Sequence, residues 1–326
     1  MRLKAIASAV PDEKWSAHRI AKLVGADVDF IENKVGIREK YILRANERGI
    51  ELAQRSVINL FGKCGIEAEA IDFLIYVTQT PEYRIPQNSA LLHDALNLRS
   101  DCGAYDISLG CSGWVYALMT AKGLIATGEF DNVMIVTCDP YSKIMDPRDK
   151  GTAAVFGDGA AASLVTRDEG LKIGFGDYGT AGHKHRSLIV EAGGSSDPVQ
   201  HWHGASLDIE GRDFTIKMQG REVFNFVLSS VPASIEKCLA KNKLSKDDIA
   251  VFALHQGSRY MLQSMARRAK ISEGKLAINI EKYGNTVSSS VPMLLEEILE
   301  SSDYPKGPIL VSGFGVGLSW ATVVLS

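Results

Sequence analysis

The sequence has few cysteines, almost no excess charge and no long apolar run, and each of these shortages excludes a class of protein. Its 326 residues contain five widely spaced cysteines and no C-x-x-C pair, which argues against a disulfide framework or a zinc ribbon. The net charge is only −3 and the basic residues are scattered, so nothing indicates a nucleic-acid partner. No apolar stretch approaches the roughly 20 residues that span a membrane.

Hydrophobic residues, by contrast, are plentiful. They make up 45% of a chain whose length suggests two domains or two similar halves around a large core. The run from Met1 to Ala7 is too short for a signal peptide and is soon interrupted by Pro11. We therefore expect a soluble protein in a reducing, cytoplasmic setting, without a membrane partner.

One short stretch, Asp106–Gly113, is placed for chemistry. It reads D-I-S-L-G-C-S-G and leads from an expected short strand into apolar and small residues at helical spacing. The first N–H groups of a helix lack intrahelical partners and lie at its positive end, so we expect the Cys111 thiol to ionise easily and act as a nucleophile. The alternative is that Cys111 is one more small buried hydrophobic residue.

Apolar periodicity predicts alternating strands and helices along the whole chain. We expect strands at residues 2–10, 71–78, 132–137, 249–255, 276–280 and 308–325, and a strand pair at residues 152–166. We expect helices at residues 16–25, 27–35, 50–64, 87–96, 114–127, 219–242, 258–269 and 288–301.

A repeated motif indicates an internal duplication. Phe156–Gly159 and Phe314–Gly317 both read F-G-x-G, and each leads into a strand of small residues. We therefore predict two tightly packed halves: residues 1–166, which carry the cysteine, and residues 167–326.

Two further residues follow expected strands or turns in the second half. His255 ends an apolar run, and Asn285 lies in Gly-Asn-Thr before a helix. Strand ends of a doubly wound sheet collect at one edge, so related halves would bring both residues to Cys111. Imidazole and amide groups donate to an oxyanion, and the backbone N–H of Cys111 or Gly315 would add a second donor set. This predicts acyl transfer through a thioester attack, although a lone histidine or a Gly-Asn-Thr turn is often only structural.

Two H-x-H pairs, His183-x-His185 and His201-x-His203, offer a competing interpretation as a metal site. Two pairs without a clear carboxylate pattern do not define a closed coordination geometry, so we predict no metal. We interpret residues 180–212 as a loop or insert over the active site.

At this point the sequence resembles the thiolase-fold condensing enzymes, in particular 3-oxoacyl-[acyl-carrier-protein] synthase III. The resemblance runs over almost the full length. It rests on Gly36–Glu39, Asp106–Gly113, Asp146-Pro147 with Gly151-Thr152, Phe156–Ala160, His255-Gln256, Gly284–Thr286 with Ser290–Pro292, and Gly313–Gly315 with Gly317 and Trp320.

The resemblance implies a five-layered αβαβα fold of two similar halves, a homodimer, and a catalytic triad of Cys111, His255 and Asn285. In the family, the cysteine takes an acyl group from coenzyme A. Histidine and asparagine then assist decarboxylation of a malonyl thioester on acyl carrier protein, and the resulting carbanion attacks the acyl-cysteine. Coenzyme A and phosphopantetheine thioesters are substrates, and no cofactor is implied.

The chain departs from the family pattern at several expected substrate-binding positions. Ser258 stands where the family's H-Q-A-N motif has asparagine, and Phe30 stands for the tryptophan that stacks on adenine. Lys34 and Lys150 stand for arginines that contact the nucleotide, and lysine binds phosphate less well than arginine does. Ile85 falls where the family places an acyl-pocket residue that reaches across the dimer. These changes leave the donor open, either coenzyme A or a carrier-protein thioester.

Three alternatives to condensation remain open on the sequence. A relative of the same fold would move the acyl group to an oxygen or nitrogen acceptor, but Asn285 favours condensation because such a transfer needs a base and not that asparagine. A partner subunit of a heterodimeric synthase is a second alternative, against which Cys111 counts. An H-x-H metallohydrolase is the last.

Overall fold

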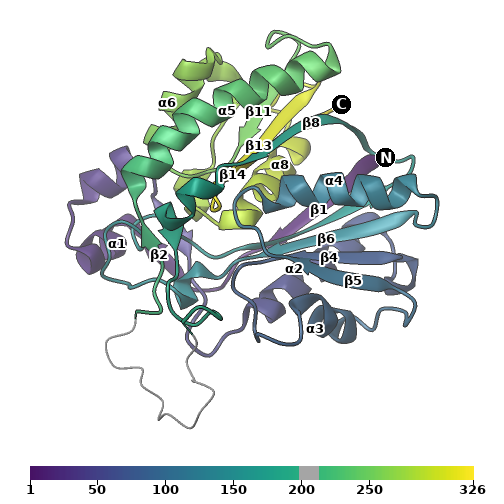
Figure 1. The fold of residues 1–326 in the computed structure, drawn as a ribbon, viewed down its shortest axis with the longest axis horizontal. Helices are drawn as coiled ribbons and strands as arrows, with labels where there is room; N and C mark the ends of the chain where they lie inside the picture. Colours follow the sequence, from purple (N-terminus) through teal and green to yellow (C-terminus); the bar gives the residue numbers. More distant parts are fainter. Residues whose placement is uncertain (198–212) are drawn as a thin grey trace.

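A ten-stranded mixed sheet runs through the computed structural model, which describes residues 1–197 and 213–326 (Figure 1). From one edge to the other, the strands are β12 (Leu276–Ala277), β11 (Val251–Leu254), β13 (Ile309–Gly315), β14 (Ser319–Leu325), β8 (Leu171–Thr180), β1 (Arg2–Ala9), β7 (Ala160–Thr166), β6 (Asn132–Cys138), β4 (Phe73–Val77) and β5 (Gly103–Ile107). β8 and β1 pair only through Lys172 with Arg2 and Leu171 with Leu3. The molecule therefore contains two five-stranded sheets joined along a short seam.

The two five-stranded sheets have the same strand order and the same pairing directions. In each, the first strand in chain order lies at the seam, and the fifth, fourth, second and third strands follow outward. The two pairings nearest the seam are antiparallel and the two outer ones are parallel. This repetition supports the division into residues 1–166 and 167–326, which stays a prediction.

Helices complete five layers, so the predicted αβαβα fold is confirmed. Between the sheets, α4 (Gly113–Ala126) and α8 (Ser290–Glu300) contact strands of both. α4 is apolar around most of its circumference, as a helix buried on several sides requires. The outer faces are covered by α2 (Gly49–Cys64) and α3 (Asn88–Ala95) on the first sheet, and by α5 (Gly220–Asn242) and α6 (Arg259–Ala269) on the second.

Alternate residues of the buried strands supply different cores. On β4, Ile75 and Val77 pack toward the central helices, whereas Leu74 and Tyr76 pack toward α2 and α3. Because both faces are covered, the strand reads as a continuous apolar run and not as an alternating one.

Shorter elements lie around the two sheets. They are β2 (Lys14–Ser16) paired with β3 (Glu39–Tyr41), β9 (Leu188–Ile189) paired with β10 (Lys217–Met218), α1 (Ala17–Val24), α7 (Ile280–Tyr283), the π-helix η1 (Phe30–Val35), and the 3-10 helices η2 (Ala68–Ala70), η3 (Tyr141–Lys143), η4 (Gly182–Ser187), η5 (Glu273–Lys275) and η6 (Val287–Ser289). Among the described residues, no helix combines the length and the apolar composition needed to cross a membrane.

The prediction of a strand pair at residues 152–166 is wrong. Only β7 is a strand there, and the N–H groups of Val155 and Phe156 both donate to the carbonyl of Thr152 in a tight turn. The carboxylate of Asp149 accepts from the N–H and hydroxyl of Thr152, and this local side-chain bonding favours a turn over a strand. The strand expected at 276–280 shortens to β12, and β8 forms a seam strand that the periodicity did not predict.

We expect Trp114, buried in the first turn of α4, to be a major source of stability. Its indole Nε1 donates to the Ser163 hydroxyl at 3.0 Å. Trp114→Ala should lower the free energy of unfolding by about 3–5 kcal/mol because it leaves a cavity. Trp114→Phe removes the hydrogen bond, leaves the Ser163 hydroxyl unpaired and removes only part of the ring volume, so it should cost less, about 1–3 kcal/mol.

Urea unfolding followed by circular dichroism measures both losses. Met119→Ala, on the partly exposed side of the same helix, is the control and should change stability by less than about 0.5 kcal/mol. Equal losses for Met119→Ala and Trp114→Ala would contradict the assignment of Trp114 to the core.

Candidate active site

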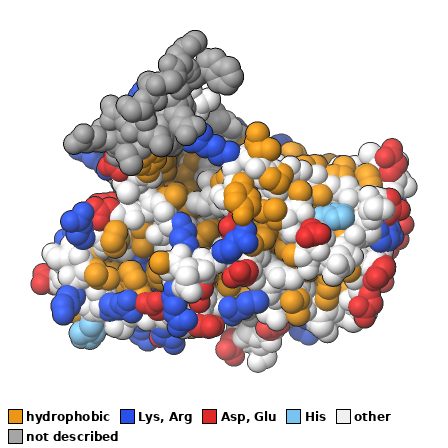
Figure 2. Space-filling model, turned by 90° about the horizontal axis from the view of Figure 1, so that it is seen from below, with side chains coloured by type: hydrophobic (Ala, Val, Ile, Leu, Met, Phe, Trp, Pro, Cys, Tyr) orange, Lys and Arg blue, Asp and Glu red, His pale blue; other side chains and the backbone are white. Residues whose placement is uncertain are grey.

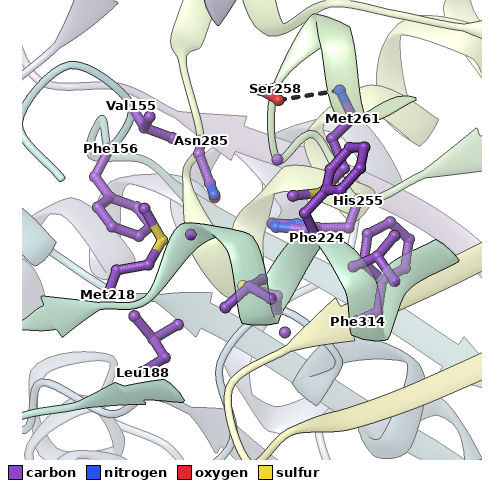
Figure 3. Close-up of a pocket in the computed structure, with 16 residues that line it drawn as sticks. Val155, Phe156, Leu188, Met218, Phe224, His255, Ser258, Met261, Asn285 and Phe314 are labelled. Carbon is purple, nitrogen blue, oxygen red and sulfur yellow. Dashed lines mark hydrogen bonds between the residues drawn. The ribbon is translucent and has the colours of Figure 1, made fainter. Parts of the chain in front are cut away.

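The structure brings Cys111, His255 and Asn285 to one cavity of about 210 Å³ (Figure 3). Cys111 lies between β5 and α4, His255 directly follows β11, and Asn285 lies in the turn between α7 and η6. In Figure 3, the side chains of His255 and Asn285 extend toward the same space. The cavity therefore joins one residue of the first half to two residues of the second.

The end of β13 passes directly against Cys111. A Cβ atom on Gly313 would lie 2.4 Å from the Cys111 carbonyl oxygen, and one on Gly315 would lie 2.9 Å from the Cys111 Sγ. Real Cβ atoms do not approach so closely, so only glycine allows this strand to reach the thiol. The backbone N–H of Cys111 and that of Val316 both lie close enough to interact with the thiol.

The His255 ring is held in one orientation. Its Nδ1 lies 2.6 Å from the Ser290 hydroxyl, and its ring meets Phe314 edge to face at 5.5 Å between centroids. Nε2 has no hydrogen-bond partner among the described residues and is left for the cavity. The Ser290 hydroxyl both donates and accepts, so it is compatible with either neutral tautomer of the ring.

The Asn285 amide is held with its nitrogen free. Its Oδ1 accepts from the N–H of Val287 at 2.9 Å, and because only an oxygen accepts, this bond fixes the amide orientation. Val287 has a φ of 53°, which is uncommon for a β-branched residue and indicates a strained turn. The Asn285 Nδ2 group has no partner in the described part of the chain and remains a donor toward the cavity.

Burial makes both the thiol and the imidazole neutral near pH 7. Burial, reinforced by the charge of Asp139, raises the pKa of Cys111 to about 12, although the backbone N–H groups beside the thiol act in the opposite direction. Burial also lowers the pKa of His255 to about 3. The expectation that the helix terminus makes this thiol ionise easily is therefore wrong for the free protein, since desolvation outweighs the helix dipole.

Apolar side chains enclose most of the cavity. The walls come from Val155, Phe156, Leu188, Met218, Val223, Phe224, Val227, Met261 and Phe314. An outer hollow of about 670 Å³ lies beside the cavity, and the two share Val155, Met218, Gly220 and Ser258 in their walls.

The outer hollow contains the residues predicted to bind a nucleotide. Phe30, Lys34 and Lys150 line it, and Lys150 Nζ lies 4.3 Å from the centre of the Phe30 ring. In Figure 2 an open hollow is visible on the face shown, with hydrophobic side chains in its wall and lysines or arginines at its edge. Ser258 lies between both spaces, and its hydroxyl accepts from the Met261 N–H at 3.2 Å as the N-cap of α6.

Ile85 is not brought to the cavity within one chain. Its side chain is 89% exposed, and it lines a separate hollow with Tyr83 and Asp106.

The H-x-H pairs form no metal site in the described part of the chain. His183 and His185 are exposed, and His185 Nδ1 lies 3.1 Å from the Gly182 carbonyl. His201 and His203 lie outside the described residues, as do residues 198–212 of the expected insert. No group of three or more histidine, cysteine or acidic residues that would hold a metal occurs among the described residues.

Sequence reasoning missed two contacts that shape the site. Ser290 lies 35 positions from His255, and its contact depends on how α8 packs under β11. The Val316 N–H belongs to the turn after β13, and a backbone donor has no side-chain signature. The Ser-Val-Pro start of α8 was part of the family resemblance and was the one available signal for Ser290.

Family models and a curated relative match this chain under the same family name. Residues 105–182 match the family model for 3-oxoacyl-[acyl-carrier-protein] synthase III, and residues 239–326 match the model for its C-terminal part. The chain is 31% identical over 328 aligned positions to the beta-ketoacyl-[acyl-carrier-protein] synthase III of Streptococcus pneumoniae, covering 100% of this chain and 98% of the relative.

Solved structures of proteins with the same family name have the same fold as this chain. A crystal structure of a 3-oxoacyl-(acyl-carrier-protein) synthase III superposes with a TM-score of 0.92 at 35% identity, covering 99% of this chain and 98% of that one. The beta-ketoacyl-[acyl carrier protein] synthase III of Thermus thermophilus superposes with a TM-score of 0.89 at 28% identity, covering 100% and 98%.

The raised pKa of Cys111 predicts unusual alkylation kinetics. In the free protein, iodoacetamide should modify Cys111 more slowly at neutral pH than it modifies glutathione. The rate should rise about tenfold per pH unit through the range in which the fold persists, because the thiolate fraction keeps increasing below a pKa of about 12. Peptide mass spectrometry across pH 7 to 10 measures this rate, and a plateau below pH 9 would contradict the prediction.

Proposed function

The chain belongs to the 3-oxoacyl-[acyl-carrier-protein] synthase III family, and we propose that Cys111, His255 and Asn285 carry out its reaction. It is an acyltransferase that condenses an acyl thioester with a malonyl-type thioester on acyl carrier protein. The observation that supports the residue assignment is one cavity shared by a buried thiol, a free imidazole nitrogen and a free amide NH₂.

In the first half-reaction, Cys111 attacks the carbonyl carbon of the acyl thioester. The thiol proton passes to His255 Nε2 as the new carbon–sulfur bond forms, in the tautomer whose Nδ1–H donates to Ser290. We assign the oxyanion donors to the backbone N–H groups of Cys111 and Val316, an assignment supported by their position beside the thiol. When the tetrahedral intermediate collapses, the carbon–sulfur bond of the donor breaks, and its thiolate takes the proton back from His255.

In the second half-reaction, the malonyl thioester loses carbon dioxide. The electron pair of the broken bond moves to the α-carbon. The enolate oxygen accepts hydrogen bonds from Asn285 Nδ2–H and from His255 Nε2–H, once the ring has changed to the other neutral tautomer, in which Nδ1 accepts from the Ser290 hydroxyl. A neutral imidazole suits this role, and burial keeps the pKa of His255 low enough for it. The carbanion then attacks the acyl-Cys111 carbonyl, the cysteine thiolate leaves, and one proton from solvent restores the thiol.

The outer hollow is the proposed route for the thioester arms. In this proposal Lys34 and Lys150 bind phosphate and the Phe30 ring stacks on a base, which is supported by their common position in the wall of this hollow. The apolar inner cavity is suited to the extended pantetheine arm that carries the thioester to Cys111. We propose that the reaction needs no cofactor or metal beyond these thioesters.

We further propose a homodimer that works in the cytoplasm. Tyr83 and Ile85 expose large hydrophobic side chains on one loop, and the family resemblance places Ile85 at a contact across the dimer. Five free cysteines suit a reducing compartment. Sedimentation analysis of the purified protein tests the dimer, and a monomer at micromolar concentration would contradict it.

Intact-protein mass spectrometry tests the proposed reaction. After incubation with a panel of acyl-coenzyme A and acyl-carrier-protein thioesters, the wild type should gain one acyl group and Cys111→Ala should gain none. Addition of malonyl-acyl carrier protein should then remove the adduct and yield a 3-oxoacyl thioester. Asn285→Ala should still load but lose condensation by about 10²-fold or more, since it lacks one enolate donor.

Each other outcome points elsewhere. Loading followed by transfer only to oxygen or nitrogen acceptors would favour the alternative transferase. No adduct from any donor would favour a non-catalytic partner subunit and contradict the assignment of Cys111.

Ser290→Ala tests the orientation of His255. Without the hydroxyl, neither neutral tautomer is held, so kcat should fall by about 10-fold or more while KM for the thioesters changes little. Ser234→Ala is the matched control, because Ser234 is also buried and bonded to another hydroxyl, that of Thr322, at 2.9 Å. Equal effects of the two variants, or a change confined to KM, would contradict a role for Ser290 in catalysis.

A further inference from the structure

Lys40, on β3, is a fully buried lysine that the proposed reaction does not use. Its side chain is 0% exposed, and its ammonium donates to the carbonyl of Phe156 at 2.7 Å and to the carbonyl of Ala153. The Trp15 ring lies beside it, with its centroid 5.7 Å from Nζ. A buried ammonium is costly unless it is hydrogen-bonded, so this lysine stays buried because specific acceptors surround it.

The two carbonyls belong to a segment that holds Asn285. The Asn285 N–H donates to the Val155 carbonyl at 3.0 Å, and the Gly157 N–H donates to the Asn285 carbonyl at 3.0 Å. Phe156 and Asn285 thus face each other across a short parallel bridge. Residues 153–157, which we call the bridge segment, are bonded to Lys40 on one side and to Asn285 on the other.

Close packing leaves Lys40 little room to move. A Cβ atom on Gly157 would lie 3.2 Å from the Lys40 Cβ, and one on Gly284 would lie 3.3 Å from it. The stem of the lysine therefore runs between the bridge segment and the turn that carries Asn285. Burial lowers the pKa of Lys40 to about 7, and the charge of Asp158 acts in the opposite direction.

Asp158, the residue that directly follows the bridge segment, fixes the C-terminal end of that segment. Its carboxylate accepts from the N–H of Leu43 at 2.8 Å and from the N–H of Ser142 at 3.2 Å, and its own N–H donates to the Tyr41 carbonyl at 2.8 Å. The chain around Lys40 is thus tied to the bridge segment by both main-chain and side-chain bonds.

We infer that Lys40 is a positioning residue for condensation: by binding the carbonyls of Ala153 and Phe156, it fixes the bridge segment that sets the place of the Asn285 amide. This inference rests on the proposed role of Asn285 as a donor to the enolate. In the described part of the chain, neither Cys111 nor His255 is hydrogen-bonded to the bridge segment, so loading of the cysteine should not depend on Lys40. The two half-reactions should therefore separate when the ammonium is removed.

The experiment compares the wild type with Lys40→Met, Lys40→Arg and Lys14→Met. Methionine keeps the apolar stem of the lysine and removes the ammonium. Lys14→Met is the matched control, because Lys14 is an exposed lysine on β2, the strand paired with β3. Intact-mass kinetics with an acyl-coenzyme A panel from acetyl to decanoyl measure loading. Malonyl-acyl carrier protein added to the preloaded enzyme measures condensation, and amide hydrogen exchange reports on residues 153–158 and 283–287.

We expect Lys40→Met to slow condensation by about 10- to 100-fold, the size of effect that a displacement of about 1 Å produces, while loading stays within about twofold. Hydrogen exchange should become faster in both peptides. Lys14→Met should match the wild type, and Lys40→Arg, which keeps a cation and its donors, should recover part of the condensation rate.

Equal losses in loading and condensation, or unchanged condensation, would overturn the inference. If Lys40→Met does not fold, Lys40→Arg tests the inference in the same assays. We then expect full loading and an intermediate rate of condensation. Equal losses of the two rates would contradict the role of Lys40. A wild type that neither loads nor condenses would refute the proposed function, while unchanged exchange in a folded Lys40 variant would refute the role of Lys40 by itself.

Discussion

The site depends on one steric constraint, which is that each half of the chain must pass very close to a functional turn of the other. Gly313 and Gly315, in the second half, lie against Cys111, where any Cβ would collide. Gly157, in the first half, lies against the Tyr283 carbonyl, and a Cβ there would be 2.3 Å away. Each of the two F-G-x-G motifs therefore supplies a glycine that allows the chain to approach a functional turn closely.

Burial, which this close packing enforces, sets the electrostatics. The thiol and imidazole are both neutral in the free protein, and the remaining polar groups are matched in detail: the Ser290 hydroxyl with one ring nitrogen, and the Val287 N–H with the Asn285 oxygen. The two groups of His255 and Asn285 that have no partner among the described residues, Nε2 and Nδ2, face the cavity. A substrate carbonyl then meets donors already in place, and few water molecules need to rearrange as charge develops.

Much of this arrangement is readable from the sequence because it depends on short, local patterns. The buried strands, the strand-to-helix turn at Cys111 and the repeated glycine motif all have signatures within a few residues, and the family resemblance added the five layers. The turn at 152–155 was missed because small and β-branched residues there suit a strand, and the competing bonds from Asp149 are visible only in three dimensions. The raised pKa of Cys111 and the burial of Lys40 depend on packing between distant segments, which periodicity does not report.

The seam between the sheets, with its two residue pairs, has a consequence for how the protein is made. The ribosome delivers the thiol of Cys111 long before it delivers His255 and Asn285, which are 144 and 174 positions further along the chain. A nascent chain that ends at Thr166 already has every strand of the first sheet but neither partner for the thiol. The proposed site of Cys111, His255 and Asn285 is therefore incomplete throughout synthesis, and it assembles only after the last helices and strands have docked.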